Sequence, residues 1–480
     1  MSRTTLYWHD YETSGIDPRR DRPVQFAGLR TDLDLHPIGE PLTLYCRPSL
    51  DTLPTPEASL VTGITPQQAW EKGVCEADFV AAIHGELARP GTCALGYNTL
   101  RFDDEVTRNT LYRNFYDPYE REWRSGNSRW DLIDAVRAAA ALRPEGIEWP
   151  RDEQGRPSFR LEVLTAANGI AHAGAHDALV DVRATVELAR LLRQRQPRLY
   201  DFLWSNRGKR EAAALIKLGE FAPVLHVSEK FPAERHCLAV VVALARHPDN
   251  GNGVIVYDLS ADPAPLLELD VEQIRARLFT PVRDMPEGVE RIPLKTVHLN
   301  RCPVLAPMNV LRPADIERLQ LDLERCRRHL ETLRRASGLD GKLAEVFSAA
   351  PPEKPDDGDP DLMIYRGGFF GDADRYRMSE IRALGPEDLA RRYFDFDDAR
   401  LPEMLFRYRA RNWPDTLSEE ERARWETLRR TRLTEAGHGA SITLTEYENR
   451  IEALGREHAD DSRKLAVLEA LRAWGREIIS

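Results

Sequence analysis

The chain has 480 residues, of which 42% are hydrophobic and 30% charged, and its formal net charge is −11. Such a length accommodates roughly two to four domains, and such a composition is typical of a folded globular protein rather than of a disordered or fibrous chain. The longest apolar run, residues 237–245, is far shorter than the ~20 residues that cross a bilayer. No signal-peptide pattern opens the sequence, so we expect a cytoplasmic protein that does not bind membranes.

Neither the net charge nor the cysteine content identifies a binding partner. An acidic net charge does not exclude nucleic acid, because binding a polyanion requires only a local basic groove. No CxxC pair occurs among the six cysteines, at positions 46, 75, 93, 237, 302 and 326. In a cytosolic chain of this size we expect free thiols rather than disulfides.

Residues 1–195 alternate between strand-like and helix-like patterns. Aromatic and β-branched runs bounded by turn formers predict strands over 5–13, 24–35, 42–48 and 92–98. Helical spacing of apolar residues predicts helices over 65–73, 76–89, 103–116, 129–143, 161–169 and 176–195. This order of strands and helices favours an α/β domain with a mixed sheet.

The remainder of the chain predicts two further domains. Short apolar runs over 221–228, 237–247, 252–260 and 292–305 indicate a small, mostly β domain, followed by a helix over 313–335. The segment 350–361 is a linker rich in Pro, Asp and Gly, and the residues after it are helical in period. We therefore expect domains at 1–195, 196–349 and 362–480.

Two acids on the first predicted strand, Asp10 and Glu12, point to the same face, because residues i and i+2 of a strand do so. Two carboxylates that close repel each other, and burying either without a partner is costly. Either this face is open to water, or a cation lies there. Oxygen ligands suit a hard ion such as Mg²⁺ or Mn²⁺. A D-x-E pair alone does not decide between these alternatives.

Further acids occur where a metal site would need them. Asp103 and Asp104 follow a predicted strand and open a helix, while His176 precedes Asp181 at the start of a late helix. Each alone also fits a solvated surface position. His172 and His176 have the i, i+4 spacing of a zinc pair, but neither a third soft ligand nor the glutamate of a zinc-protease motif accompanies them.

Together, D-x-E, then N-x₃-F-D at 98–103, then H-x₄-D at 176–181 form an ordered set. This set resembles the histidine-containing branch of the DEDD 3′–5′ exonuclease superfamily. Longer phrases are similar to the bacterial exonuclease I family, among them HDYETSG, GYNTLRFDDEVTRNTLYRNFYDPY, LRPEGIEWP, CPVLAPMNVLRP, YRGGFFGDADR and LFRYRARNWPDTL. The resemblance therefore extends over nearly the whole chain.

The resemblance implies a ribonuclease-H-like exonuclease domain, an SH3-like β domain and a C-terminal helical domain. It implies hydrolysis of single-stranded DNA from the 3′ end, with release of 5′-mononucleotides, in DNA repair and recombination. Two Mg²⁺ ions, with Mn²⁺ as a possible substitute, would be held by Asp10, Glu12, Asp103 and Asp181. His176 would accept the proton of the attacking water. Asp104 is the alternative to Asp103, which the N-x₃-F-D register favours.

The resemblance also suggests contacts with substrate and with a partner. Glu12, Thr13 and Arg160 would contact the bound strand, and Trp8, Tyr97, Arg101, Phe102 and Trp130 are further candidates for which packing in the core is an equal alternative. Family members are expected to dock the acidic, apolar C-terminal tail of single-stranded-DNA-binding protein. Arg143 and Arg312 suit such a carboxylate, although both also fit ordinary surface positions.

Two other functions compete with a DNA exonuclease. An RNA-trimming or proofreading member of the same superfamily would need little beyond the catalytic domain, whereas this chain continues for some 280 residues after 196. A non-catalytic scaffold on the same fold would be expected to lack ligands, whereas all four acids and the histidine are present. The self-contained three-domain layout favours a monomer.

Overall fold

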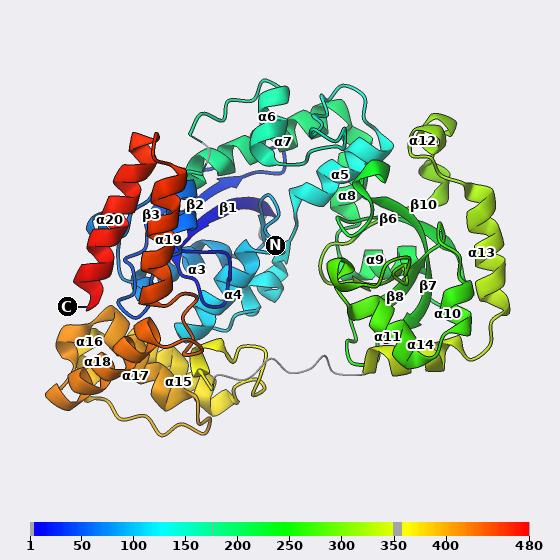
Figure 1. Cartoon of the computed structure of the whole chain (residues 1–480). Helices are drawn as coiled ribbons and strands as arrows, with labels where there is room; N and C mark the ends of the chain where they lie inside the picture. The colour runs from blue at the N-terminus through cyan, green and yellow to red at the C-terminus, as the bar shows by residue number, and fades with distance from the viewer. Residues whose placement is uncertain (1–3, 175, 349–357, 480) are drawn as a thin grey trace. The chain divides into compact units, whose positions relative to one another are not determined.

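The computed structural model describes residues 4–174, 176–348 and 358–479 (Figure 1). The chain forms two compact units. One consists of Met1–Arg129, His172–Val186 and Pro355–Ser480, and the other of Trp130–Ala171 and Glu187–Lys354. Each unit has a five-stranded sheet. Most of the expected linker, 350–357, lies outside the described residues.

The sheet of the first unit has the strand order β3-β2-β1-β4-β5. The antiparallel members are β1 (Thr5–Thr13), β2 (Pro23–Thr31) and β3 (Leu42–Tyr45), while β4 (Thr92–Leu95) and β5 (Ser128–Arg129) run parallel to β1. The predicted mixed sheet is thereby confirmed. The strand predicted over 24–35 ends at Thr31, because the chain turns at Asp32, whose carboxylate accepts bonds from the backbone N–H groups of Asp34 and His36.

Alternation along β1 places Tyr7 and Tyr11 on one face of the strand and the two acids on the other. Tyr7 and Tyr11 pack with Phe26 of β2 and with Phe79 and Ile83 of α3 (Glu76–Leu87) in one core cluster. The side chains at positions 10 and 12 point to the opposite face. The register is interrupted between positions 12 and 13, so β1 ends just after its second acid.

The helices of the first unit lie between and after the strands of its sheet. The segment between β3 and β4 holds α1 (Pro56–Thr62), α2 (Pro66–Lys72) and α3 (Glu76–Leu87). α4 (Asp103–Arg113) follows β4, and α7 (Ala178–Arg195) begins in this unit. Pro at the first turn starts α1 and α2, and a capping box between Thr65 and Gln68 secures α2.

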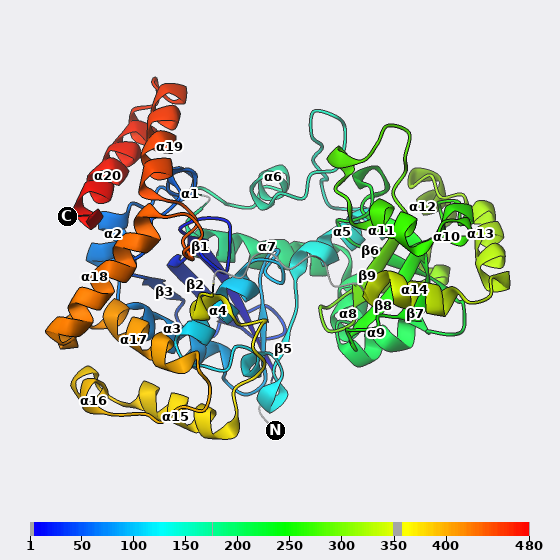
Figure 2. The same ribbon diagram turned by 60° about the horizontal axis from the view of Figure 1, so that its bottom comes forward.

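The C-terminal helices belong to the same compact unit as the first sheet. They are α15 (Asp372–Ala383), α16 (Pro386–Arg391), α17 (Leu401–Asn412), α18 (Glu419–Thr434), α19 (Leu444–Glu457) and α20 (Ser462–Ile479). α19 and α20 lie side by side (Figure 2). Tyr112 and Phe115 of the α4 region share a core with Ile381, Leu401 and Met404.

The second unit contains a sheet in which every pairing is antiparallel, in the order β10-β6-β7-β8-β9. Its strands are β6 (Pro223–Val227), β7 (Leu238–Arg246), β8 (Gly253–Asp258), β9 (Leu294–His298) and β10 (Val304–Pro307). Its helices are α5 (Leu132–Leu142), α6 (Leu161–Ala167), α8 (Pro197–Ser205), α9 (Lys209–Ile216), α10 (Ala264–Glu268), α11 (Val271–Phe279), α12 (Pro313–Arg318), α13 (Leu323–Arg335) and α14 (Leu339–Ser348). Of these helices, α5 and α6 were predicted, whereas the described part of the β domain expected at 196–349 contains α8 to α14 in place of the single helix expected there.

The helix predicted over 313–335 is wrong as a single element. α12 and α13 are separated at Gln320, whose φ of 52° leaves the helical region. The Asp322 side chain then accepts a bond from the N–H of Arg325 and starts α13 as its N-cap.

Two acids near the described end of the expected linker are not exposed. Asp359 and Asp361 are buried and form ion pairs with Arg407. All six cysteines are free thiols, as expected. In the portion of the chain that the structure covers, no helix is both long and apolar enough to cross a membrane.

Candidate metal centre

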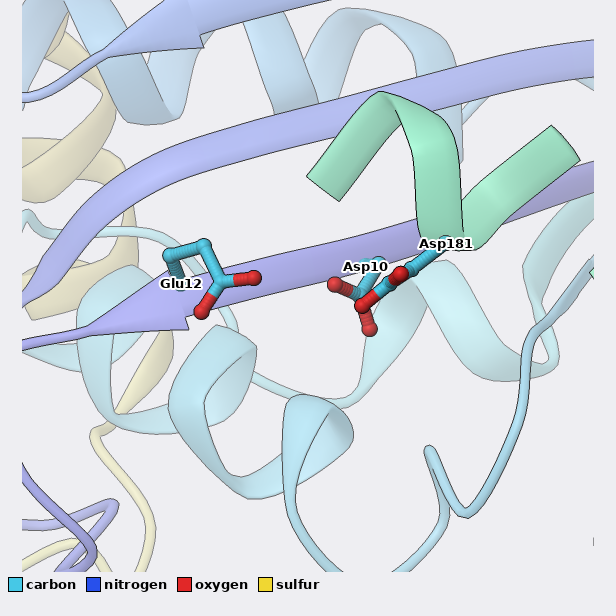
Figure 3. Close-up of side chains that lie close together, drawn as sticks. All are labelled: Asp10, Glu12 and Asp181. Atoms are coloured by element: carbon cyan, nitrogen blue, oxygen red, sulfur yellow. The ribbon is translucent and has the colours of Figure 1, made fainter. Parts of the chain in front are cut away.

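Three carboxylates converge beside β1. Asp10 and Glu12 come from that strand, and Asp181 comes from the first turn of α7 (Figure 3). One carboxylate oxygen from each lies within 4.8 Å of the others, which is the spacing of ligands around one cation. The predicted convergence of positions 10 and 12 on one strand face is therefore present, and a helix distant in sequence completes it.

Burial and mutual repulsion make this cluster unfavourable without a cation. Burial, followed by the nearby charges of Asp103, Glu12 and Asp181, raises the pKa of Asp10 well above its usual value. Burial, followed by Asp181, Asp103 and Asp177, raises the pKa of Glu12 to about 9. Protonation relieves such repulsion, and so does a divalent cation. The all-oxygen donor set fits a hard divalent ion.

Asp103 and Asp104 have different environments despite being adjacent. Asp103 is 4% exposed, and its Oδ1 accepts a bond of 3.1 Å from the N–H of Tyr11, between the two acids of β1. Asp104 forms ion pairs of 2.7 Å with Arg121 and 2.6 Å with Arg129. These arginines overcome the effect of burial and hold the pKa of Asp104 well below its usual range. Asp104 is thus neutralised within the protein, while the charge of Asp103 contributes to the raised pKa values of Asp10 and Glu12.

The histidine beside Asp181 is His172. Its Nε2 lies 2.5 Å from Asp181 Oδ1, and its side chain is 6% exposed. His176 is exposed, in the turn before α7, with a left-handed φ of 70°. Within the described ranges, the three-carboxylate group includes neither His176 nor Asp103. Sequence reasoning considered His172 only as a zinc ligand and missed this contact, because spacing does not reveal how a turn folds back.

Gln25 is a second residue that sequence reasoning missed. It lies opposite Glu12 in the β1–β2 register and is 1% exposed. Its Oε1 accepts a bond of 3.2 Å from the N–H of Ala178, and its Nε2 donates bonds of 3.3 Å to Asp177 and 3.1 Å to Tyr45. Gln25 therefore ties the first turn of α7, which carries Asp181, to the sheet.

The residues expected to contact substrate lie in different surroundings. Thr13 follows Glu12 at the end of β1, and its hydroxyl donates a bond of 2.7 Å to the carbonyl of Gly15. Arg160 belongs to the second unit, where its side chain is 73% exposed and bonds to Glu162 at 2.7 Å. Trp8 and Trp130 are core residues, at 0% and 2% exposed.

Arg143 and Arg312 come together around Asp315 in the second unit. Arg143 Nη1 lies 3.4 Å from Asp315, and Arg312 forms an ion pair of 2.8 Å with the same carboxylate. Asp315 is buried, whereas the two arginine side chains are 28% and 39% exposed. Arg318, not singled out from the sequence, lies 3.3 Å from Asp315. The structure thus assembles a partly exposed basic cluster from two distant segments.

Three family models match the chain. The model of the exonuclease family matches residues 7–189, that of the exonuclease I SH3-like domain matches 207–349, and that of the exonuclease I C-terminal domain matches 358–478. The three kinds of domain expected from the sequence are therefore confirmed.

Close relatives match along their whole length. Exodeoxyribonuclease I of Escherichia coli (strain K12) is 47% identical over 477 residues, covering 99% of this chain and 98% of the relative. The structure of a moderately thermophilic exonuclease I from Methylocaldum szegediense is 60% identical, with a TM-score of 0.94, 99% of this chain covered and 100% of that one. E. coli exonuclease I in complex with a dA16 oligonucleotide is 47% identical, with a TM-score of 0.95 and the same coverage.

Two further solved structures of E. coli exonuclease I bear on ligands. A zinc-bound form of its complex with single-stranded DNA matches with a TM-score of 0.94 at 46% identity, covering 100% of both chains. A complex of SSB and exonuclease I with the inhibitor CFAM matches with a TM-score of 0.90 at 45% identity, covering 99% of this chain and 100% of that one.

Proposed function

The chain belongs to the exonuclease I family, and from this membership we propose that it hydrolyses single-stranded DNA from the 3′ end, releasing 5′-mononucleotides in DNA repair and recombination. The observation that carries the proposal is the carboxylate cluster of Asp10, Glu12 and Asp181, within a chain whose full length matches exodeoxyribonucleases. The full-length match favours DNA over the RNA-trimming alternative, and the complete set of acids argues against a scaffold.

The exonuclease family depends on divalent metal, and the carboxylate cluster provides a place for it. We propose two Mg²⁺ ions, replaceable by Mn²⁺, held by Asp10, Glu12, Asp103 and Asp181. Bound there, two such ions would supply positive charge that stabilises the attacking and the leaving oxygen of a phosphodiester. The raised pKa values of Asp10 and Glu12 support the proposal, because burial and repulsion between carboxylates are both relieved by added positive charge.

Proton transfer is assigned to His176, which would accept a proton from the attacking water through its imidazole. Its exposed position on the turn before α7 supports this role, because it leaves the ring accessible to substrate. His172 acts instead by holding Asp181 through the 2.5 Å contact. Asp181 is then oriented from one side by His172, while Gln25 holds the helix that carries it.

Substrate contacts are proposed for Glu12, Thr13 and Arg160. Thr13 extends directly from the metal-binding strand, so a terminal nucleotide at the cluster would meet its backbone. Arg160 has a largely exposed guanidinium, which suits a phosphate contact.

A partner role is proposed for the cluster of Arg143 and Arg312. The solved complex of a relative with SSB supports a partner of this kind. Both guanidiniums are partly exposed, and a terminal carboxylate can pair with such groups. We further propose a cytoplasmic monomer, with domains at 1–195, 196–349 and 362–480 joined across 350–361.

The function is tested with oligonucleotides of one sequence prepared as single-stranded DNA, duplex DNA and RNA. With a 5′ label and Mg²⁺, single-stranded DNA should shorten stepwise from its 3′ end and yield 5′-mononucleotides, and EDTA should stop the reaction. Faster degradation of RNA, or release of labelled mononucleotide from the 5′ end at the outset, would contradict the proposal.

A further inference from the structure

The first unit contains a cavity of about 400 Å³ whose lining residues include none of the proposed metal ligands. It lies between the segment from the β1–β2 loop to α3 and the segment containing α16–α18, and its volume falls in the range typical of small-molecule sites. Three arginines and three tryptophans line it: Arg22, Arg47, Arg411, Trp70, Trp413 and Trp425. A cavity that combines cations with aromatic rings has the chemistry to bind an aromatic anion.

Arg22 is the buried cation of this cavity. It is 5% exposed, and its Nε has no hydrogen-bond acceptor among the described residues. Its nearest carboxylate partner, Glu76, lies 3.9 Å from Nη1 and is already bonded to Arg113 at 2.7 Å and to Asn114 at 2.8 Å. A buried guanidinium with an unused donor is unfavourable unless an anion reaches it.

The neighbouring charges reinforce this conclusion. Burial, followed by repulsion from Arg113 and Arg411, lowers the pKa of Arg22 to about 9. Glu76 and Asp51 attract Arg22 and offset part of this effect. Asp51 and Asp361, however, are bound directly by Arg411, at 2.8 Å and 2.7 Å. An anion entering the cavity would therefore meet a buried guanidinium whose Nε still lacks an acceptor, although the acids Glu76 and Asp415 also line the cavity.

The aromatic residues provide a surface for a planar group. The guanidinium of Arg47, an exposed residue, lies 5.9 Å from the ring centroid of Trp70. Trp413 packs edge-on against Tyr408 with centroids 5.3 Å apart, which fixes the orientation of its ring. An aromatic ring held in a fixed orientation can stack with any nucleotide base, because every base has a flat π-face.

We propose that this cavity binds a nucleoside 5′-monophosphate, with the phosphate at Arg22 and Arg47 and the base against the tryptophans. The choice of a mononucleotide rests on the proposed function, of which it is the product, whereas the preference for an aromatic anion follows from the lining residues alone. Two hydrogen bonds link the site to the end of β1: Arg22 N–H donates to Ser14 Oγ at 2.8 Å, and Ser14 N–H donates to the Arg22 carbonyl at 2.8 Å. Ser14 lies two residues after Glu12.

The proposal is tested by calorimetric titration of the full chain with thymidine 5′-monophosphate in EDTA, where the metal centre is empty of ions. Saturable binding is expected, with quenching of tryptophan fluorescence. Arg22→Gln and Arg47→Gln should each weaken it about tenfold or more. Arg19→Gln is the matched control, because Arg19 lies in the same loop, pairs with Asp17 at 3.7 Å and does not line the cavity; its affinity should equal that of the wild type.

Thymidine and inorganic phosphate test the two halves of the ligand, and both should bind about tenfold or more weakly than the nucleotide. Equal affinity of phosphate and nucleotide, or unchanged affinity in both arginine variants, would overturn the proposal. If circular dichroism shows that Arg22→Gln is unfolded, the affinity of Arg47→Gln alone tests the proposal, because Arg47 is exposed.

A nuclease assay in Mg²⁺ separates this proposal from the proposed function. An inactive chain that binds the nucleotide rejects only the activity, and an active chain that does not bind it rejects only this site.

Discussion

Glu12 is surrounded by acids, and its protonation couples the metal centre to the stability of the fold. Its pKa is about 9 in the folded chain, compared with 4.5 in an unfolded one. Between those values the folded state binds the extra proton, so the free energy of unfolding falls as pH rises from about 4.5 to about 9. The stabilisation that Glu12 contributes is complete only at a pH below 4.5, the pKa of the residue in the unfolded chain.

The fall in the free energy of unfolding with rising pH gives a prediction for Glu12→Gln, because glutamine at this position cannot ionise. In EDTA, the melting temperature of the wild type should fall between pH 5 and pH 8 more steeply than that of the variant, which should be more stable by about 1 kcal/mol or more at pH 8. Thermal unfolding followed by circular dichroism measures both curves. Parallel curves would contradict the assignment, and Mg²⁺ should remove the difference in slope.

Asp103 and Asp104 offer a matched pair of substitutions. Asp103→Asn should fold normally and lose hydrolysis at least ~100-fold, because it removes a proposed metal ligand. Asp104→Asn should lower the free energy of unfolding by about 3–5 kcal/mol, because it leaves Arg121 and Arg129 buried beside a neutral amide. Urea unfolding and Mg²⁺-dependent hydrolysis separate the two effects. Loss of stability in Asp103→Asn with activity retained would reverse the assignment.

At the scale of elements, the metal centre depends on how β1, β2 and α7 are held together. α7 supplies Asp181, and the link from its first turn to the sheet runs through Gln25. Replacing Gln25 by Met keeps the volume but removes these bonds, so metal affinity should fall about 10–100-fold, as for other residues that orient ligands. Titration with Mn²⁺ measures the affinity.

Gln67→Met is the control for that experiment. Gln67 likewise makes a long-range bond, donating to the carbonyl of Ala470 at 2.8 Å, but it contacts α20 rather than α7. Gln67→Met should lower the free energy of unfolding by about 1 kcal/mol and leave the affinity for Mn²⁺ unchanged. An equal loss of metal affinity in both variants would mean that Gln25 has no specific positioning role.

In the first unit, the sequence pattern predicted the strands and helices better than it predicted the contacts between them. The alternation in β1 and the helical spacing in α3 and α7 predicted those elements, and i, i+2 geometry predicted that Asp10 and Glu12 share a face. The bonds of Gln25 to residues 177 and 178 join positions more than 150 apart, and no periodicity encodes them. His172 was missed for a related reason, because the turn after it decides which histidine meets Asp181.

The sequence pattern predicted less of the structure in the second unit and in the segment before the C-terminal helices. α10 and α11 are short and lie between strands, where their apolar residues resemble loop or strand residues. Residues 359–361 have the composition of a linker, yet Asp359 and Asp361 are buried because arginines of α17 reach them. Composition reports average exposure, whereas burial of an acid depends on a partner distant in sequence.

At the scale of the whole molecule, buried ion pairs join the N-terminal and the C-terminal segments of the first unit. Arg432 of α18 lies 3.1 Å from Asp51, which follows β3, and also pairs with Asp359; all three are buried. Arg432→Met leaves these acids short of a partner and should lower the free energy of unfolding by about 3–5 kcal/mol. Urea unfolding tests this value.

Arg424→Met provides the comparison, since Arg424 lies on the same helix, is 56% exposed and pairs with Glu403. Its effect should remain below about 1 kcal/mol. Equal effects of the two substitutions would mean that the buried ion pairs do not hold the C-terminal helices to the exonuclease sheet.

The central claim is that the carboxylates beside β1 hold the ions on which hydrolysis of single-stranded DNA depends. The most direct test measures Mn²⁺ binding and Mg²⁺-dependent release of 5′-mononucleotides in the same preparations of the wild type and Asp10→Asn. We predict two bound Mn²⁺ ions in the wild type, and in the variant the loss of at least one ion together with a fall in hydrolysis of about 1,000-fold or more. Wild-type hydrolysis and unchanged ion binding in Asp10→Asn would contradict the account.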